Sequence, residues 1–118
     1  EMLAGSISFD IQGWGHTLDG CYADTAEIGF RIGGGNAVLS CCGFYNNPRM
    51  GLRKSTAIVH QVGQLLVDSC NFDGGAGCER LYEAADGTTL LWRANFAQGG
   101  HDMKGEARKL SETCRSTP

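Results

Sequence analysis

Proline, charged residues and long apolar runs are all scarce in this sequence, and each shortage excludes a class of protein. Only 2 of the 118 residues are proline and 19% are charged, so the chain is neither a proline-rich linker nor a charge-rich disordered segment. No apolar run approaches the roughly 18 residues of a membrane-spanning helix, and we expect no membrane partner. The net charge of −3, without a basic stripe, argues against a nucleic-acid partner.

Signals for targeting, metal binding and serine-nucleophile chemistry are also missing. The segment Glu1–Gly5 has neither a basic region nor a long apolar stretch, so no signal peptide is predicted. A start at Glu instead of Met suggests a processed chain or an excised fragment. No Cys/His set has zinc spacing, so we expect no metal, and we expect no other cofactor. No Gly-x-Ser-x-Gly occurs, so serine-nucleophile chemistry has no support.

Glycine and apolar residues are abundant instead, and the apolar residues form a four-fold repeat. Glycine contributes 18 residues, and apolar side chains make up 42% of the chain. The apolar positions follow offsets of 2, 7, 3 and 2, and successive repeats start 21, 28 and 24 residues apart. The skeletons are Phe9, Ile11, Leu18, Cys21, Ala23; Phe30, Ile32, Leu39, Cys42, Phe44; Ile58, His60, Val67, Cys70, Phe72; and Tyr82, Ala84, Leu91, Ala94, Phe96. Such repetition indicates stacked units that bury their apolar faces against one another.

The spacing inside each repeat predicts three short strands. Residues at i and i+2, such as Phe9 and Ile11, lie on one face of a strand, and glycine-rich clusters such as Gly33–Asn36 supply the corners. We therefore predict an all-β fold, a parallel β-helix of about four coils. The main alternative is an α/β domain with a helix over Ser55–Ser69, which Gly63 disfavours.

The whole chain, residues 1–118, is expected to be a single β-helix domain, with coils over about residues 5–100. Residues 101–118 would form a C-terminal cap or tail. There a short capping helix is predicted to start at Asp102, and its apolar positions are Met103, Ala107, Leu110 and Cys114. No cap is evident before the first coil. We therefore expect the chain to be a fragment of a longer β-helix or to dock against a partner there.

Three of the six cysteines occupy one equivalent position of the repeat. Cys21, Cys42 and Cys70 share this slot with Ala94 of the fourth repeat. Exchange with alanine favours a small buried apolar slot that free thiols fill. The remaining cysteines are Cys41, Cys78 and Cys114, and a disulfide between two of them stays open.

The repeats differ in the connection that joins one unit to the next, which measures 7, 14 and 10 residues. Insertions on one side of a solenoid form loops on one face, often the binding face. This face would hold Tyr45 and three cations of the longest loop, Arg49, Arg53 and Lys54. Trp92 is expected on an outward column beside it, where an aromatic ring suits a sugar or a subunit contact.

Two pairs of acids are candidate catalytic groups. Asp24 and Asp73 follow equivalent positions two coils apart, and Asp19 and Asp68 form a second such pair. Two coils span roughly 9.6 Å, and carboxyl groups about 6.5–9.5 Å apart suit an inverting glycosidase. A lyase would instead use the loop cations to neutralise a uronate. The alternative is that these are ordinary turn aspartates.

The segments Asn36–Phe44 and Gln64–Phe72 resemble coils of the pectin-lyase-like right-handed β-helix, in particular the polysaccharide-lyase-like repeats of bacterial carbohydrate enzymes and phage tail spikes. The resemblance covers about residues 5–100 as a repeat pattern. It implies a right-handed helix, contact with polysaccharide by binding or cleavage, an extracellular or virion-surface location and a possible homotrimer.

From these observations we expect a module that binds polysaccharide on its variable-loop face. One alternative is a fragment of a polysaccharide-cleaving enzyme, either a glycoside hydrolase or a lyase, that uses the paired aspartates. The other is a structural segment of an oligomeric phage-type fibre or spike. Fold resemblance alone does not choose among them.

Overall fold

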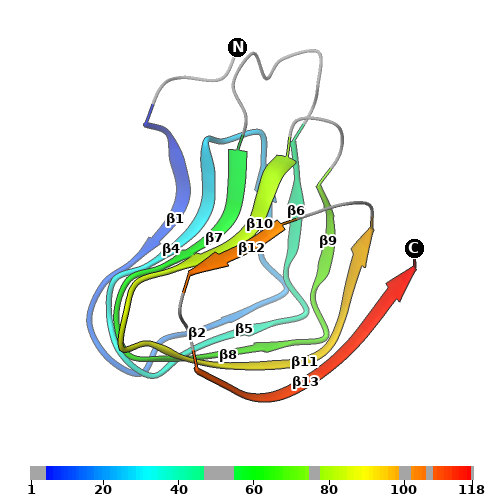
Figure 1. The fold of residues 1–118 in the computed structure, drawn as a ribbon. Helices are drawn as coiled ribbons and strands as arrows, with labels where there is room; N and C mark the ends of the chain where they lie inside the picture. The colour runs from blue at the N-terminus through cyan, green and yellow to red at the C-terminus, as the bar shows by residue number, and fades with distance from the viewer. Residues whose placement is uncertain (1–4, 47–54, 75–77, 99–101, 106–107, 118) are drawn as a thin grey trace.

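The computed structural model describes residues 5–46, 55–74, 78–98, 102–105 and 108–117. The described chain is a parallel β-solenoid, in which strands of successive turns lie side by side (Figure 1). The strands are β1 (Ile7–Ile11), β2 (Thr17–Asp19), β3 (Tyr22–Asp24), β4 (Ile28–Ile32), β5 (Ala37–Ser40), β6 (Gly43–Tyr45), β7 (Ser55–His60), β8 (Gln64–Asp68), β9 (Asn71–Gly74), β10 (Cys78–Ala84), β11 (Thr89–Gln98), β12 (Asp102–Gly105) and β13 (Arg108–Thr117). Over the described ranges there is no helix of the length and apolarity needed to cross a membrane.

The strands form three walls. The first wall has the order β1-β4-β7-β10-β12, the second contains β2, β5, β8, β11 and β13, and the third contains β3, β6 and β9. Strand β11 is long enough to pair with β8 on the second wall and with β9 on the third. Three turns of three strands are thus followed by β10–β11 and β12–β13. About three regular turns, compared with the four expected, is a small difference.

On the first and second walls, the first three repeats stack in the register that the sequence predicts. Phe9 pairs with Phe30, which pairs with Ile58, and Leu18 pairs with Leu39, which pairs with Val67. The inward side chains of the second and third turns are buried almost completely. The rings of Phe9 and Phe30 stack with their centroids 5.1 Å apart. The core is therefore a set of side-chain columns that run through the turns.

The fourth repeat departs from the expected register by one residue. Trp92, not Leu91, pairs with Val67, and Ala97, not Phe96, pairs with Phe72. The corner between Ala84 and the second wall is one residue longer than in the other turns, so every later position shifts. The expected core position of Phe96 was wrong for this reason, since Phe96 pairs with the outward Asn71 and is only half-buried.

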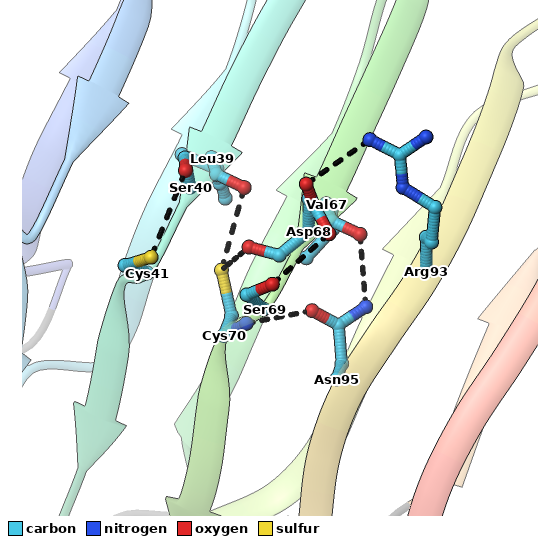
Figure 2. A network of polar contacts seen from close by, with 9 residues as sticks. All are labelled: Leu39, Ser40, Cys41, Val67, Asp68, Ser69, Cys70, Arg93 and Asn95. Atoms are coloured by element: carbon cyan, nitrogen blue, oxygen red, sulfur yellow. Dashed lines mark hydrogen bonds and ion pairs between the residues drawn. The ribbon is translucent and has the colours of Figure 1, made fainter.

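The same shift places Asn95 in the slot held by Cys42 and Cys70, so the slot is polar, not simply apolar as expected. Asn95 Oδ1 accepts from the Cys70 N–H at 2.9 Å, and its Nδ2 donates to the Val67 carbonyl at 2.9 Å (Figure 2). One turn earlier, Cys70 Sγ accepts from the Cys42 N–H at 3.3 Å and donates to the Leu39 carbonyl at 3.4 Å. The Cys70 thiol and the Asn95 amide thus bond to equivalent backbone groups of the preceding turn, one N–H and one carbonyl.

The bend beside this slot explains why the backbone groups need partners. The residue before the slot has a positive φ in each turn, at Gly20, Cys41, Ser69 and Ala94. This left-handed conformation turns the chain from the second wall to the third and interrupts the regular strand ladder. A buried N–H or C=O left without a partner there would cost about 1–3 kcal/mol. The slot side chain prevents that loss.

The predicted capping helix is not formed. The described residues expected in it lie instead in β12, which pairs with β10, and in β13, which pairs with β11 along almost its whole length. Ala107 lies outside the described residues. The exposed edge of the solenoid offers a row of backbone partners, and such an edge favours strand over helix in a segment with weak helical preference. Gly105 in the proposed helix weakens that preference further.

A buried histidine and tyrosine on neighbouring strands of the first wall, β7 and β10, form a hydrogen-bonded pair. His60 Nε2 lies 3.1 Å from the Val62 carbonyl, which can only accept, so Nε2 carries the proton. Nδ1 then accepts from the Tyr82 hydroxyl at 2.7 Å. Burial lowers the pKa of His60 and raises the pKa of Tyr82 to about 12. Both side chains are therefore neutral at physiological pH.

Replacing Asn95 tests the slot. We expect Asn95→Ala to lower the free energy of unfolding by about 2 kcal/mol, because it leaves the Cys70 N–H and the Val67 carbonyl without the hydrogen bonds that Asn95 makes. Asn95→Cys should cost less than half as much, because cysteine occupies the same slot in the three other turns. Urea titration followed by circular dichroism measures both. Equal losses in the two variants would show that the slot requires packing volume only.

The neutral His60 predicts how stability depends on pH. The pKa of His60 is lowered in the folded chain from its ordinary value of 6.5, so below pH 6.5 the unfolded chain binds more protons. The free energy of unfolding should fall as the pH drops below that value, by at most about 1.4 kcal/mol per pH unit. The double variant His60→Ile with Tyr82→Phe should lose this slope. Thermal unfolding between about pH 5 and pH 7 compares them, and an unchanged slope would contradict the assignment.

Candidate functional site

The first candidate acid pair is separated by an irregularity in the third wall. Asp24 pairs with Tyr45, as expected, but Tyr45 pairs with Gly74 because β9 contains one extra residue relative to β6. Asp73 is thus displaced from the column of Asp24. Asp24 is exposed and accepts a hydrogen bond from Thr25 Oγ1 at 2.7 Å. The side chain of Asp73 lies outside the described part of the structure, and the catalytic role of the pair stays a prediction.

The second pair keeps its column. Asp19 pairs with Ser40, Ser40 with Asp68, and Asp68 with Arg93 on the second wall. Arg93 Nη2 lies 3.0 Å from Asp68 Oδ2, and Ser69 Oγ donates to Oδ1 at 3.1 Å. The hydrogen bond from Arg93 lowers the pKa of Asp68. A general acid needs a raised pKa, so Asp68 has the properties of a carboxylate base or a structural group.

The candidate binding residues have different outcomes. Arg49, Arg53 and Lys54 lie outside the described residues. The outward position predicted for Trp92 is wrong: its side chain is 1% exposed and stacks on Phe72 with ring centroids 5.4 Å apart. Arg93 takes the outward position in its place. Tyr45, at the end of β6, is half-buried and lines a groove.

This groove runs along the third wall and has a volume of about 340 Å³. It is lined by Gly20, Cys21, Tyr22, Cys41, Cys42, Gly43, Phe44, Tyr45 and Asn71. Tyr22, Gly43 and Asn71 pair with one another on successive turns, and the next position is Phe96. The groove therefore follows one outward column of the solenoid and the bend beside it.

Gly43 shapes the groove because it has no side chain. A Cβ at Gly43 would lie 2.9 Å from Cδ2 of Tyr22, closer than two carbon atoms pack. The φ of Gly43 is not positive, so the backbone does not require glycine, and the reason for it is space. The ring of Tyr22, which is 57% exposed, lies over this glycine and forms one side of the groove.

The described lining of the groove carries no charged side chain. Its polar groups are two phenols, the Asn71 amide and thiols. Burial raises the pKa of Cys21, so that thiol stays neutral, and Cys41 is free and exposed. The groove can therefore stack against apolar ligand faces and exchange hydrogen bonds, and its lining holds no carboxylate and no cationic side chain. The described residues also contain no cluster of three or more His, Cys, Asp or Glu that could hold a metal ion.

Comparison with protein-family models, curated proteins and solved structures found no match. The functional argument therefore depends on the groove itself. Sequence reasoning identified Tyr45 but missed Tyr22, Gly43 and Asn71. Their common position, one residue after the cysteine slot and one before the last inward residue of the repeat (Ala23, Phe44 or Phe72), was visible in the sequence. It was overlooked because Tyr, Gly and Asn share no chemical type.

Asn46 follows Tyr45 and is fully buried. Neither its Nδ2 nor its Oδ1 has a hydrogen-bond partner among the described residues. An amide buried without partners is destabilising, by about 1–3 kcal/mol. It contrasts with Asn95, whose amide is paired at both ends.

We therefore expect Asn46→Leu, which has a similar volume, to raise the free energy of unfolding by about 1–2 kcal/mol. The exposed Asn71→Ala serves as a control and should change it by less than about 0.5 kcal/mol. Urea titration measures both. A loss of stability in Asn46→Leu would instead mean that the amide has a bound partner in solution.

Proposed function

We propose that this chain is a carbohydrate-directed β-helix module that binds polysaccharide in the groove of its third wall. The observation that carries the proposal is the uncharged groove between Tyr22, Tyr45 and Asn71, beside the ends of the strands that lead into the variable connections. Its volume of about 340 Å³ lies within the range of about 300–1,000 Å³ that is usual for small-ligand sites.

A sugar ring fits the chemistry of this groove. A pyranose has apolar C–H faces and a rim of hydroxyl groups, so it can stack on phenol rings while its hydroxyls bond to the Asn71 amide. Tyrosine suits such a ligand because its ring is apolar and its hydroxyl is polar. The uncharged lining favours a neutral sugar over a uronate at this position.

The resemblance to pectin-lyase-like right-handed β-helices supports polysaccharide as the partner, and we include membership in that class in the proposal. Cleavage by Asp24, Asp73, Asp19 and Asp68 is a second hypothesis. It draws less support, because the extra residue in β9 displaces Asp73 and an ion pair engages Asp68. A role as a segment of an oligomeric fibre is a third hypothesis.

Affinity electrophoresis in gels that contain xylan, galactomannan, laminarin or polygalacturonate tests the binding proposal. We expect at least one neutral polysaccharide to retard the protein. Tyr22→Ala and Tyr45→Ala should each weaken this retention about tenfold, equivalent to about 1.4 kcal/mol. Gly43→Ala should weaken it similarly, because the new methyl group displaces the Tyr22 ring.

The control is Ser8→Ala, which changes an exposed residue of the first wall and should leave retention unchanged. Retention by no polysaccharide, or equal retention of the wild-type protein and all four variants, would contradict the proposal. Release of reducing ends or of unsaturated sugars, lost in Asp19→Asn, would favour the catalytic hypothesis instead.

A further inference from the structure

The most exposed large apolar side chain among the described residues is Trp14, which does not line the groove of the third wall. Trp14 is 74% exposed and lies at the corner between β1 and β2. An indole left this open in a folded chain is unusual enough to require an explanation.

The ring of Trp14 lies on a glycine of the next turn. A Cβ at Gly35 would lie 2.8 Å from Cζ3 and 2.9 Å from Cη2 of Trp14. The neighbouring Gly15 N–H donates to the Gly35 carbonyl at 3.1 Å and fixes this register. One face of the indole is thus supported by backbone, and the side chain as a whole remains open to solvent.

The glycines under this corner serve close packing. Gly33, Gly34 and Gly35 have no positive φ, so the backbone does not require glycine at these positions. A Cβ on Gly34 would lie 1.6 Å from the Gly13 carbonyl oxygen, and one on Gly63 would lie 2.7 Å from Cα of Gly35. The backbones of three successive turns therefore approach one another too closely for side chains, and Trp14 lies on this glycine backbone.

Two exposed amide side chains and a hollow follow the glycine on which the indole lies. Asn36, directly after Gly35, and Gln64, its neighbour on the next turn, are both exposed. They line a hollow of about 270 Å³ whose other lining residues are Ala37, Val38 and Leu66. The lining carries no charged side chain. The exposed indole thus lies on Gly35, which directly precedes Asn36 and this partly apolar, amide-lined hollow.

We propose that this corner is a second glycan-contact site, in which a pyranose ring of a neutral saccharide stacks on Trp14 and its hydroxyls bond to Asn36 and Gln64. The groove of the third wall has the same arrangement of an aromatic ring over a glycine, because Tyr22 of the first turn lies over Gly43 of the second. The two sites share no residue. A polysaccharide long enough to reach both would bind more tightly than either site alone allows.

Tryptophan fluorescence tests the site directly, because the two tryptophans differ in exposure. Trp14 is 74% exposed, whereas Trp92 is 1% exposed, so acrylamide quenches chiefly Trp14. The probes are cellohexaose, xylohexaose and mannohexaose, with trigalacturonate as the charged comparison. We expect at least one neutral hexasaccharide to shield Trp14 and lower the acrylamide quenching constant at least twofold, and trigalacturonate to leave it unchanged.

Variants assign the effect to named residues. Trp14→Ala, which removes an exposed side chain, should lower the affinity measured by calorimetry at least tenfold for this site. Gln64→Ala and Asn36→Gly should lower it about three- to tenfold; glycine is chosen because the φ of Asn36 is +57°. Tyr22→Ala and Gly43→Ala should leave the shielding of Trp14 intact, so failure at the groove and failure at this corner are distinguishable.

Two results would overturn the proposal. One is that none of the three neutral hexasaccharides shields Trp14, or that Trp14→Ala binds them with unchanged affinity and stoichiometry. The other is that the protein is an oligomer in sedimentation velocity and that Trp14→Ala converts it to a monomer, which would make this corner a contact between copies of the chain.

Discussion

The whole structure depends on backbone hydrogen bonds between parallel strands of successive turns. These bonds hold neighbouring strands at about 4.8 Å, and they place equivalent residues of every turn in one column. A column that points inward must be filled by side chains that stack, such as Phe9 and Phe30 or Phe72 and Trp92. A column that points outward becomes a row of surface groups with a fixed spacing.

The bend between the second and third walls is the place where this backbone bonding cannot continue unaided. The left-handed residue at each bend turns the chain, and the next side chain bonds to the backbone of the preceding turn. Cys42, Cys70 and Asn95 each donate to the carbonyl of an inward residue of the turn before, namely Leu18, Leu39 and Val67. Cysteine and asparagine are interchangeable here because both are small and both can donate and accept. The neighbouring Cys42 side chain and burial raise the pKa of Cys70, which keeps that thiol in its donating form.

The first three turns were predictable from the sequence because their apolar positions keep one spacing and permit one register. The fourth was not, since Leu90, Leu91 and Trp92 are consecutive apolar residues and any of them could enter the core. The largest ring takes the inward position, where it covers Phe72. That choice depends on the length of the corner before it, which a pattern of apolar residues does not determine. The C-terminal strands depend on the solenoid edge with which they pair, and no local signal marks them.

Prediction of the candidate sites from the sequence was limited in a similar way. Sequence reasoning searched for residues that carry chemistry, and it found aspartates, cations and aromatics. The structure shows that the two exposed rings, Tyr22 and Trp14, each lie over a residue without a side chain on the next turn, Gly43 and Gly35. Because turns repeat at strand spacing, a missing side chain in one turn leaves room for an aromatic ring of the preceding turn to lie flat on the backbone. A ring held in this way loses little conformational freedom when a ligand binds, since it is already ordered. In a solenoid of this kind, the stronger signal for a binding surface is therefore a pair of residues in one column, not the aromatic alone. The pair consists of an aromatic residue and, on the next turn, a glycine that no positive φ requires.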